Sequence, residues 1–209
     1  MTTIRRLADS CVTVTTDQGT TLIDPGFFTF DSGEVDLDTI GDVQRVLITH
    51  EHGDHVKPEF VAWLLDRSPD LTVHANDAVA GLLSGHDIEV VVDDPEGVRS
   101  EDCAHGILPN GSTVPNRAFT VDGVLTHPGD SHEPTSSGPV LALPLIVPWA
   151  SMRGSMEFAM RVRPQQVVPI HDFYLSELGR NFLYGMADGV LGGADIEFIG
   201  LNWGDSANV

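Results

Sequence analysis

One short stretch of the chain, THEHGDH at residues 49–55, concentrates side chains that bind metals. It contains three histidines and an aspartate: His50, His52, Asp54 and His55. Residues two apart on an extended chain point to the same side, so His50 and His52 are placed to hold one cation. Asp54 and His55, at the turn that follows, are placed to hold a second cation nearby. Imidazole together with carboxylate suits zinc, with iron or manganese as competitors.

Neither a zinc helix nor a chance grouping of histidines accounts for this stretch as well. The letters HE open the H-E-x-x-H motif of zinc helices, but the position that must carry its second histidine is Asp54. A single histidine is usually a surface or core residue. Three histidines and an aspartate directly after an apolar run are seldom accidental. The stretch therefore predicts a metal site.

The segments around this stretch are expected to bring further polar residues to it. RVLITH, GVLTHPGD and QVVPIH are three apolar runs with the character of strands, and each ends in histidine or aspartate. If their sheets are adjacent, those ends converge in one place. Pro58 is well placed as the first residue of a helix over 58–68, directly after the metal-binding stretch.

The rest of the chain alternates between strand and helix patterns. Hairpins are expected at 11–24 and 117–127, after a first strand near the N-terminus. Further strands are expected at 71–75, 88–94, 139–147, 165–171 and 196–200, and helices at 76–85, 155–162 and 176–191. Residues 93–117 are rich in Pro, Gly, Asp and Ser, which indicates mostly loop. The pattern is that of an α/β protein.

Composition limits the partners that the chain can have. With 209 residues, 41% of them hydrophobic, we expect a single folded domain over 1–209. Its 11 Lys and Arg against 31 Asp and Glu give a net charge of -20, which disfavours nucleic acid and anionic membranes. No apolar run is long enough for a membrane span or a signal peptide. Two cysteines, Cys11 and Cys103, are too few for a disulfide framework. We therefore expect a cytoplasmic protein with a small-molecule substrate, and its oligomeric state is open.

THEHGDH resembles the H-x-H-x-D-H signature of the metallo-β-lactamase fold superfamily, and later segments match that family's order of ligands. These segments are AHGIL with His105, HPGDS with Asp130 and PIHD with His171. LIDPG at 22–26 and HPGDS are similar, more narrowly, to ascorbate-6-phosphate lactonase-like metal-dependent hydrolases. The resemblance covers nearly the whole chain. It implies a four-layer αβ/βα sandwich of two mixed β-sheets flanked by helices.

The resemblance also implies which residues hold two metal ions. One ion would be held by His50, His52 and His105, the other by Asp54, His55 and His171, with Asp130 bridging them. His127 and His132 flank Asp130 and are alternatives to His105, which lies in the loop-rich stretch. Asp24 matches an aspartate that braces the metal loop from behind. A turn residue before Pro25 explains Asp24 almost as well.

This ligand set predicts hydrolysis. Two divalent cations lower the pKa of a shared water, so that a metal-bridging hydroxide can attack a small ester, lactone, amide or phosphoester. Asp54 is expected to orient that nucleophile and to pass a proton to the leaving group. A phosphodiesterase or nuclease of the same fold is one alternative, although the net charge disfavours it. A non-catalytic metal-binding protein that kept the site is the other.

Residues that contact the substrate are expected on the loops beside the strand ends. The candidates are Phe27, Phe28, Phe30, Trp149, Met152 and Arg153. The guanidinium of Arg153 would suit a carboxylate or phosphate, but an ordinary surface charge at a helix start accounts for it equally well.

Overall fold

The computed structural model describes residues 2–209, which form two six-stranded sheets. The first has the order β12-β1-β2-β3-β4-β5 and the second the order β11-β10-β9-β8-β7-β6. The first sheet contains β1 (Thr3–Arg6), β2 (Val12–Thr16), β3 (Gly19–Ile23), β4 (Arg45–Ile48), β5 (Thr72–Ala75) and β12 (Ser206–Asn208). The second contains β6 (Val98–Ala104), β7 (Pro115–Val121), β8 (Leu125–His127), β9 (Val140–Pro144), β10 (Gln166–Ile170) and β11 (Glu197–Phe198). Both sheets mix parallel and antiparallel pairs.

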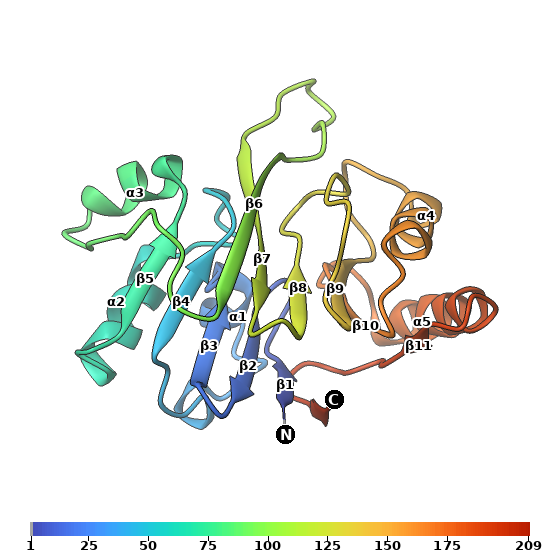
Figure 1. Ribbon diagram of the computed structural model, residues 1–209, viewed down its shortest axis with the longest axis horizontal. Coiled ribbons are helices and arrows are strands. Elements are labelled where there is room, and N and C mark those ends of the chain that lie inside the picture. Colours follow the sequence, from blue (N-terminus) through green and yellow to red (C-terminus); the bar gives the residue numbers. More distant parts are fainter. Residues whose placement is uncertain (1) are drawn as a thin grey trace.

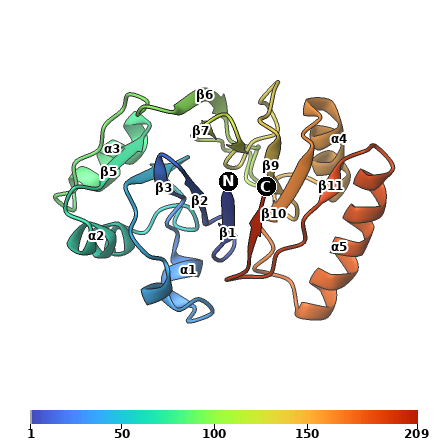
Figure 2. The same cartoon turned by 60° about the horizontal axis from the view of Figure 1, so that its bottom comes forward.

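Helices cover the outer sides of the two sheets, and the sheets face each other (Figures 1 and 2). Helices α2 (Pro58–Arg67) and α3 (Asp77–Ser84) pack on the first sheet. Helices α4 (Met152–Val162) and α5 (Glu177–Gly192) pack on the second. Two short elements, α1 (Phe27–Asp31) and the 3-10 helix η1 (Leu37–Thr39), connect β3 to β4. The predicted α/β architecture of two mixed sheets flanked by helices is thus confirmed.

The core between the sheets is made of apolar side chains from both of them. Val14 and Leu47 of the first sheet belong to one buried cluster with Phe119, Val140 and Val168 of the second. The strands β9 and β10 are covered on both faces, by the other sheet and by α4 and α5, and β9 is buried along its whole length. A strand buried on both faces reads as a continuous apolar run, which is why these segments are recognisable in the sequence.

Strand direction decides where the polar strand ends lie. The pairs β3–β4 and β4–β5 are parallel in the first sheet, as are β8–β9 and β9–β10 in the second. Strand β6 runs antiparallel to β7, and β7 antiparallel to β8, so β6 points the same way as β8. The residues that follow β3, β4, β6, β8 and β10 therefore emerge at carboxyl ends, where loops between two facing sheets can meet.

Most predicted elements are observed, but the segment 88–117 differs. Residues 88–94 contribute only an isolated bridge, between His74 and Val91, instead of a strand. The stretch predicted as mostly loop contains β6 and the beginning of β7. Strand β6 lies at the edge of its sheet, pairs only with β7 and is largely exposed, so its sequence VRSEDCA is polar. A polar edge strand lacks the apolar pattern on which the prediction depended.

The C-terminal strand β12 was also missed. It pairs with β1 and places both ends of the chain side by side (Figure 2). No helix within residues 2–209 combines the length and apolarity that a membrane crossing requires.

Candidate metal centre

The loop that carries His50, His52, Asp54 and His55 follows β4, and a neighbouring loop holds it in place. The backbone N–H of Phe27 donates to the carbonyl oxygen of Gly53 at 2.9 Å, and that of Lys57 donates to Pro25 at 2.9 Å. The backbone N–H groups of His55 and Val56 both donate to the carbonyl of His52, which forms a tight turn. The LIDPG segment therefore supports the THEHGDH loop from beneath.

A close approach between these two loops requires glycine at position 26. Its φ of -85° is open to any residue, but a Cβ there would overlap the backbone carbonyl of Asp54. Gly26→Ala is therefore expected to displace the loop, to cost about 1–3 kcal/mol of folding free energy and to weaken metal binding. Urea unfolding and a metal titration would measure the two effects.

Gly81→Ala is the matched control for that variant, because nothing surrounds the position in α3. It is expected to leave metal binding unchanged and to stabilise the helix by up to about 1 kcal/mol. Equal metal affinity in Gly26→Ala and the wild type would contradict the proposed role of Gly26.

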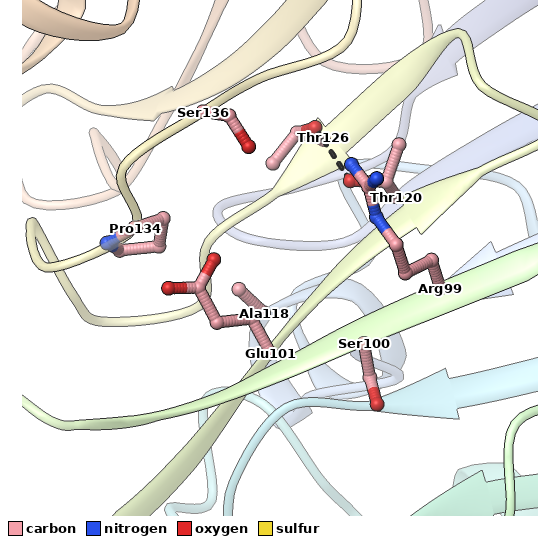
Figure 3. A pocket seen from close by; sticks show the side chains of 8 residues that line it. All are labelled: Arg99, Ser100, Glu101, Ala118, Thr120, Thr126, Pro134 and Ser136. Atoms are coloured by element: carbon pink, nitrogen blue, oxygen red, sulfur yellow. Dashed lines mark hydrogen bonds between the residues drawn. The ribbon is translucent and has the colours of Figure 1, made fainter.

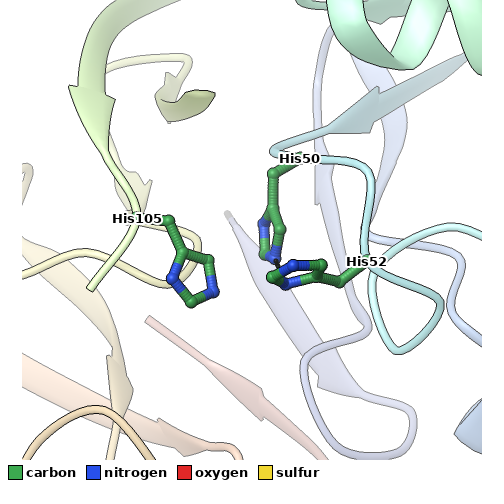
Figure 4. A group of neighbouring side chains, drawn as sticks. All are labelled: His50, His52 and His105. Carbon is green, nitrogen blue, oxygen red and sulfur yellow. Dashed lines mark hydrogen bonds between the residues drawn. The ribbon is translucent and has the colours of Figure 1, made fainter. Parts of the chain in front are cut away.

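The structure brings the predicted ligands together from both sheets. Three groups of side chains have potential ligand atoms within 4.8 Å of one another: His50, His52 and His105; His50, His55 and Asp130; Asp54, His55 and His171. Figure 4 shows His105, at the end of β6, facing His50 and His52 from the opposite side. The three groups share members, so they form one continuous cluster.

Asp130 lies between the two ends of this cluster. Its Oδ2 is 3.0 Å from Nε2 of His105, while its Oδ1 is 2.6 Å from Nε2 of His171 and 3.4 Å from Nε2 of His55. The two carboxylate oxygens thus face different histidines. This is the arrangement that a bridging carboxylate requires.

The structure brings His105 to the cluster, and the alternatives His127 and His132 lie elsewhere. Nε2 of His127 is 2.9 Å from the carbonyl oxygen of Ser10, and its Nδ1 accepts from the N–H of Gly129 at 3.2 Å, so both nitrogens are engaged. The ring of His132 stacks on Phe158 with centroids 5.1 Å apart, and burial lowers its pKa to about 4. The spacing of histidines along the chain did not distinguish among the three.

Asp24 and Thr49 hold two of the histidines from behind. Oδ2 of Asp24 is 2.6 Å from Nδ1 of His55, and its Oδ1 accepts from the backbone N–H of Thr49 at 2.8 Å. The hydroxyl of Thr49 is 3.1 Å from Nδ1 of His50 and donates to Asp24 at 2.9 Å. Such partners fix the ring orientation of a histidine ligand. Thr49 was not identified from the sequence, because a threonine before the motif has no distinguishing pattern.

Asp9 supports His171 in the same way and was also missed. Its Oδ2 is 3.5 Å from Nδ1 of His171, and its Oδ1 accepts from the N–H of Phe173 at 3.2 Å. Asp9, Asp24 and His171 all have left-handed backbone conformations, with φ of 55°, 55° and 60°. Strained non-glycine residues of this kind concentrate at functional sites. That conformation is a property of the fold and is not legible in the sequence.

The candidate substrate residues fall into different environments. Trp149 donates from Nε1 to Oδ2 of Asp130 at 2.9 Å, so it contacts the cluster directly. The ring of Phe27 lies against Gly53 of the metal loop, and Phe28 stacks on Phe173 with centroids 4.0 Å apart. Phe30 packs on Phe60 in the core, 5.2 Å between centroids.

Arg153 and Met152 lie on a different surface from the cluster. Nε of Arg153 donates to Oε1 of Glu157 at 2.8 Å, and its side chain is 86% exposed. Both residues line a hollow between α4 and α5 together with Met186. The prediction that Arg153 holds an anionic group beside the metals therefore finds no support in its position, which is that of an ordinary surface charge.

The carboxylates give one half of the cluster a strong preference for positive charge. Burial opposes the charge of His171, yet Asp130 and Asp9 raise its pKa to about 9. The pKa of His55 is well above its usual value for the same reason, with Asp24 and Asp130 outweighing burial. Burial alone would raise the pKa of Asp130, but His171 and His55 hold it well below its usual range. Positive charge is therefore stabilised here, whether on the imidazoles or on a cation.

The other half of the cluster has the properties of neutral ligands. Burial lowers the pKa of His50 and of His52, so these imidazoles keep free lone pairs. Nε2 of His50 and Nδ1 of His52 are 3.0 Å apart. Within residues 2–209, Nε2 of His105 and Oδ1 of Asp130 are buried without a hydrogen bond of normal geometry. Buried polar atoms without partners are costly, and a cation bound between them would satisfy them. The residues present thus fit divalent metal ions.

A separate hollow on the second sheet lacks such chemistry. It has a volume of about 210 Å³ and lies over β6, β7 and β8, with Arg99 and Glu101 among its walls (Figure 3). The hydroxyls of Thr120 and Thr126 bond to each other at 2.8 Å across it. No member of the histidine cluster lines it, so the cluster is the stronger functional candidate.

Comparison with known proteins agrees with this geometry. The family model described as metallo-beta-lactamase superfamily matches residues 4–57, which include the THEHGDH loop. Protein Rv0786c of Mycobacterium tuberculosis is 29% identical over 188 residues, covering 84% of this chain and 86% of that protein.

Solved structures share the fold along almost the entire chain. Igni18, a metallo hydrolase from the hyperthermophilic archaeon Ignicoccus hospitalis, has a TM-score of 0.73 at 16% identity, covering 99% of this chain and 97% of that one. The metallo-beta-lactamase fold protein YhfI from Bacillus subtilis has a TM-score of 0.70 at 13% identity, covering 99% and 98%. The narrower resemblance to ascorbate-6-phosphate lactonase-like hydrolases stays a prediction. The matched N-terminal segment and the shared fold together identify the chain as a protein of the metallo-β-lactamase superfamily, with a metallo-hydrolase fold and a candidate metal-binding cluster of histidines and aspartates.

Proposed function

We propose that this protein is a hydrolase with a dinuclear metal centre that acts on a small ester, lactone, amide or phosphoester. The observation that carries the proposal is the position of Asp130, whose two oxygens face His105 on one side and His171 on the other. In this proposal His50, His52 and His105 hold one ion, Asp54, His55 and His171 hold the other, and Asp130 bridges them. Zinc is the proposed metal, with manganese or iron as alternatives.

The roles of the side chains follow from their positions. Two bound divalent ions would supply Lewis acidity and a water of lowered pKa. Asp24, Thr49 and Asp9 keep the histidine rings oriented, so that little reorganisation is needed during the reaction. Asp54 has a side chain that is 22% exposed, whereas that of Asp130 is 6% exposed. Asp54 is therefore the carboxylate placed to exchange a proton with the substrate.

The accessible side of the cluster favours uncharged substrates. His52 and Asp54 are its partly exposed members, and Phe27, 37% exposed, lies beside them against Gly53. Tyr174 is 65% exposed, and its pKa is raised by partial burial and by nearby carboxylates, Asp54 first among them. Aromatic rings with acidic neighbours suit an apolar ester, lactone or amide better than a phosphoester.

A phosphodiesterase or nuclease activity is the second candidate, and the net charge of -20 argues against it. We also propose that the protein acts in the cytoplasm on a small molecule, with Cys11 and Cys103 as free thiols.

Metal analysis followed by a substrate panel tests the proposal. Protein as purified is expected to contain two equivalents of metal per chain, a number set by the two sets of ligands. Chelation should abolish turnover, and zinc or manganese should restore it. A panel of lactones, carboxylic esters, thioesters and phosphodiesters would identify the class. One equivalent or none, together with no turnover across the panel, would support a non-catalytic metal-binding protein instead.

Asp54→Asn is expected to fold normally and to lose activity. The hydroxyl of Ser10 bonds to the backbone carbonyl of Asp54 at 2.8 Å, a contact that the substitution leaves intact. Loss of a proton-transfer group typically lowers turnover by about 10²–10⁴-fold. Steady-state kinetics, with circular dichroism and metal content of the same samples, would measure the effect. Glu51→Gln in the same loop is the control, and turnover like that of the wild type in Asp54→Asn would sink the assigned role.

A further inference from the structure

A second charged cluster lies next to the metal centre in sequence but faces away from it. Asp172, directly after His171, is fully buried and accepts hydrogen bonds from both terminal nitrogens of Arg6. The hydroxyl of Tyr184 donates to the same carboxylate at 2.6 Å, and Nε1 of Trp203 donates to it at 3.0 Å. The carboxylate is thereby saturated with donors.

Arg180 adds a second positive charge to this cluster. Its Nε is 3.2 Å from Oδ2 of Asp172, and only 8% of the residue is exposed. Two guanidinium groups, Arg6 and Arg180, thus share one carboxylate, which leaves one buried positive charge unbalanced. Within residues 2–209, Asp172 is the one acidic residue in ion-pair contact with Arg180, and the terminal nitrogens of Arg180 make no side-chain hydrogen bond. Unpaired buried charge of this kind calls for an anionic partner.

The guanidinium of Arg180 borders a hollow of about 550 Å³. It lies flat over the ring of Trp203, 3.8 Å from the centroid, which fixes its orientation. The first turn of α5 opens on the same hollow through Leu175 and Glu177, so the positive end of the helix dipole adds to the charge of Arg180. The volume is in the range of small-molecule sites.

The remaining walls of the hollow are of two kinds. Phe173, Leu175 and Trp203 supply apolar surface, and Phe173 and Trp203 are stacked with centroids 4.9 Å apart. Glu34 and Glu177 are exposed and acidic. In a chain with a net charge of -20, these two carboxylates would repel a plain anion. They would attract a ligand that also carries an amino group.

We propose that this hollow binds a small zwitterion with an apolar body, such as an apolar α-amino acid. Its carboxylate pairs with Arg180, its amino group lies toward Glu34 and Glu177, and its apolar part rests on Phe173 and Leu175. No member of the histidine cluster lines the hollow, so the site is independent of the proposed hydrolase activity.

Nuclear magnetic resonance of the full chain tests this inference. The indole N–H of Trp203 donates to Asp172 and is a direct reporter, assigned by its loss in Trp203→Phe. L-Phenylalanine is expected to shift this resonance saturably. Two probes that each lack one charge, 3-phenylpropionate and phenethylamine, are expected to bind about tenfold more weakly or worse. No saturable shift with phenylalanine at millimolar concentrations, or equal binding of all three probes, would overturn the proposal.

Variants separate the two charged walls. Arg180→Met is expected to weaken phenylalanine binding by about tenfold or more, while Arg67→Met, an exposed arginine of α2, leaves it unchanged. Because Arg180 is buried and its loss can disturb folding, Glu177→Gln provides a second test at an exposed position. It is expected to weaken phenylalanine binding and to strengthen binding of 3-phenylpropionate. Unchanged preference between these probes in Glu177→Gln, or unchanged affinity in folded Arg180→Met, would refute the site.

Discussion

An Asp130→Asn variant is expected to bind one metal ion or none and to hydrolyse substrate about a thousandfold more slowly than the wild type. A bridging carboxylate contributes several kcal/mol of charge stabilisation, and about 1.4 kcal/mol corresponds to tenfold in rate. Asparagine has a single carbonyl oxygen, so it cannot present an anionic oxygen to both His105 and His171. It also shares that oxygen with the indole of Trp149.

Metal content by mass spectrometry and steady-state kinetics would measure both effects on the same sample. Asp66→Asn, an exposed aspartate of α2, is the matched control and should retain both metal ions and full activity. An Asp130→Asn protein with two ions per chain and unchanged turnover would show that this carboxylate does not bridge them. The substitution is expected to leave the fold intact, because Asp130 is also held by its backbone N–H, which donates to Asn116 at 3.1 Å.

Arg6→Met is expected to lower the free energy of unfolding by about 3–5 kcal/mol, the typical cost of leaving one member of a buried ion pair unpaired. Arg6 and Asp172 are both fully buried, and two guanidinium nitrogens of Arg6 contact that carboxylate. Burial would raise the pKa of Asp172, but the charge of Arg6 outweighs it and keeps the pKa below its usual value. Methionine fills similar volume but leaves the carboxylate without its main partner.

Urea unfolding followed by circular dichroism would measure the loss, with Arg67→Met as the control. Arg67 pairs with Asp38 at 2.9 Å, but the side chains are 45% and 78% exposed, so the expected change is about 0–1 kcal/mol. Equal stability of the two variants would mean that the buried pair is compensated by relaxation around it. Since Asp172 follows His171, the same variant is also expected to loosen the metal centre.

The THEHGDH loop could be predicted because its residues are contiguous. Four candidate ligands within six positions after an apolar strand leave little freedom in how they are arranged. The chain around them also has legible patterns: Pro58 begins α2 as expected, and the hairpin of β2 and β3 is visible from alternating valines around a DQG turn. Strand β9, buried on both faces, is visible as an apolar run.

Other parts of the site carry no such pattern. His105 follows β6, a polar edge strand that resembles a loop, so spacing alone leaves His127 and His132 as alternatives. Arg153 is a candidate by its charge and its place after a strand, but its position on α4 pairs it with Glu157 instead. Asp9 and Thr49 lie in ordinary-looking segments, and their relation to His171 and His50 exists only once the sheets face each other.

The sequence by itself thus determined the chemistry: an α/β chain, acidic, with a loop suited to two divalent ions and three later strand ends that match a known order of ligands. The tertiary structure decided which histidine completes the cluster, that Asp130 lies between its two halves, and which side chains orient the rings. The physical reason is that ligand type is a property of a residue, and local spacing survives in the chain. Convergence depends on parallel strands from two sheets ending at one edge, a long-range result of packing that no local pattern encodes.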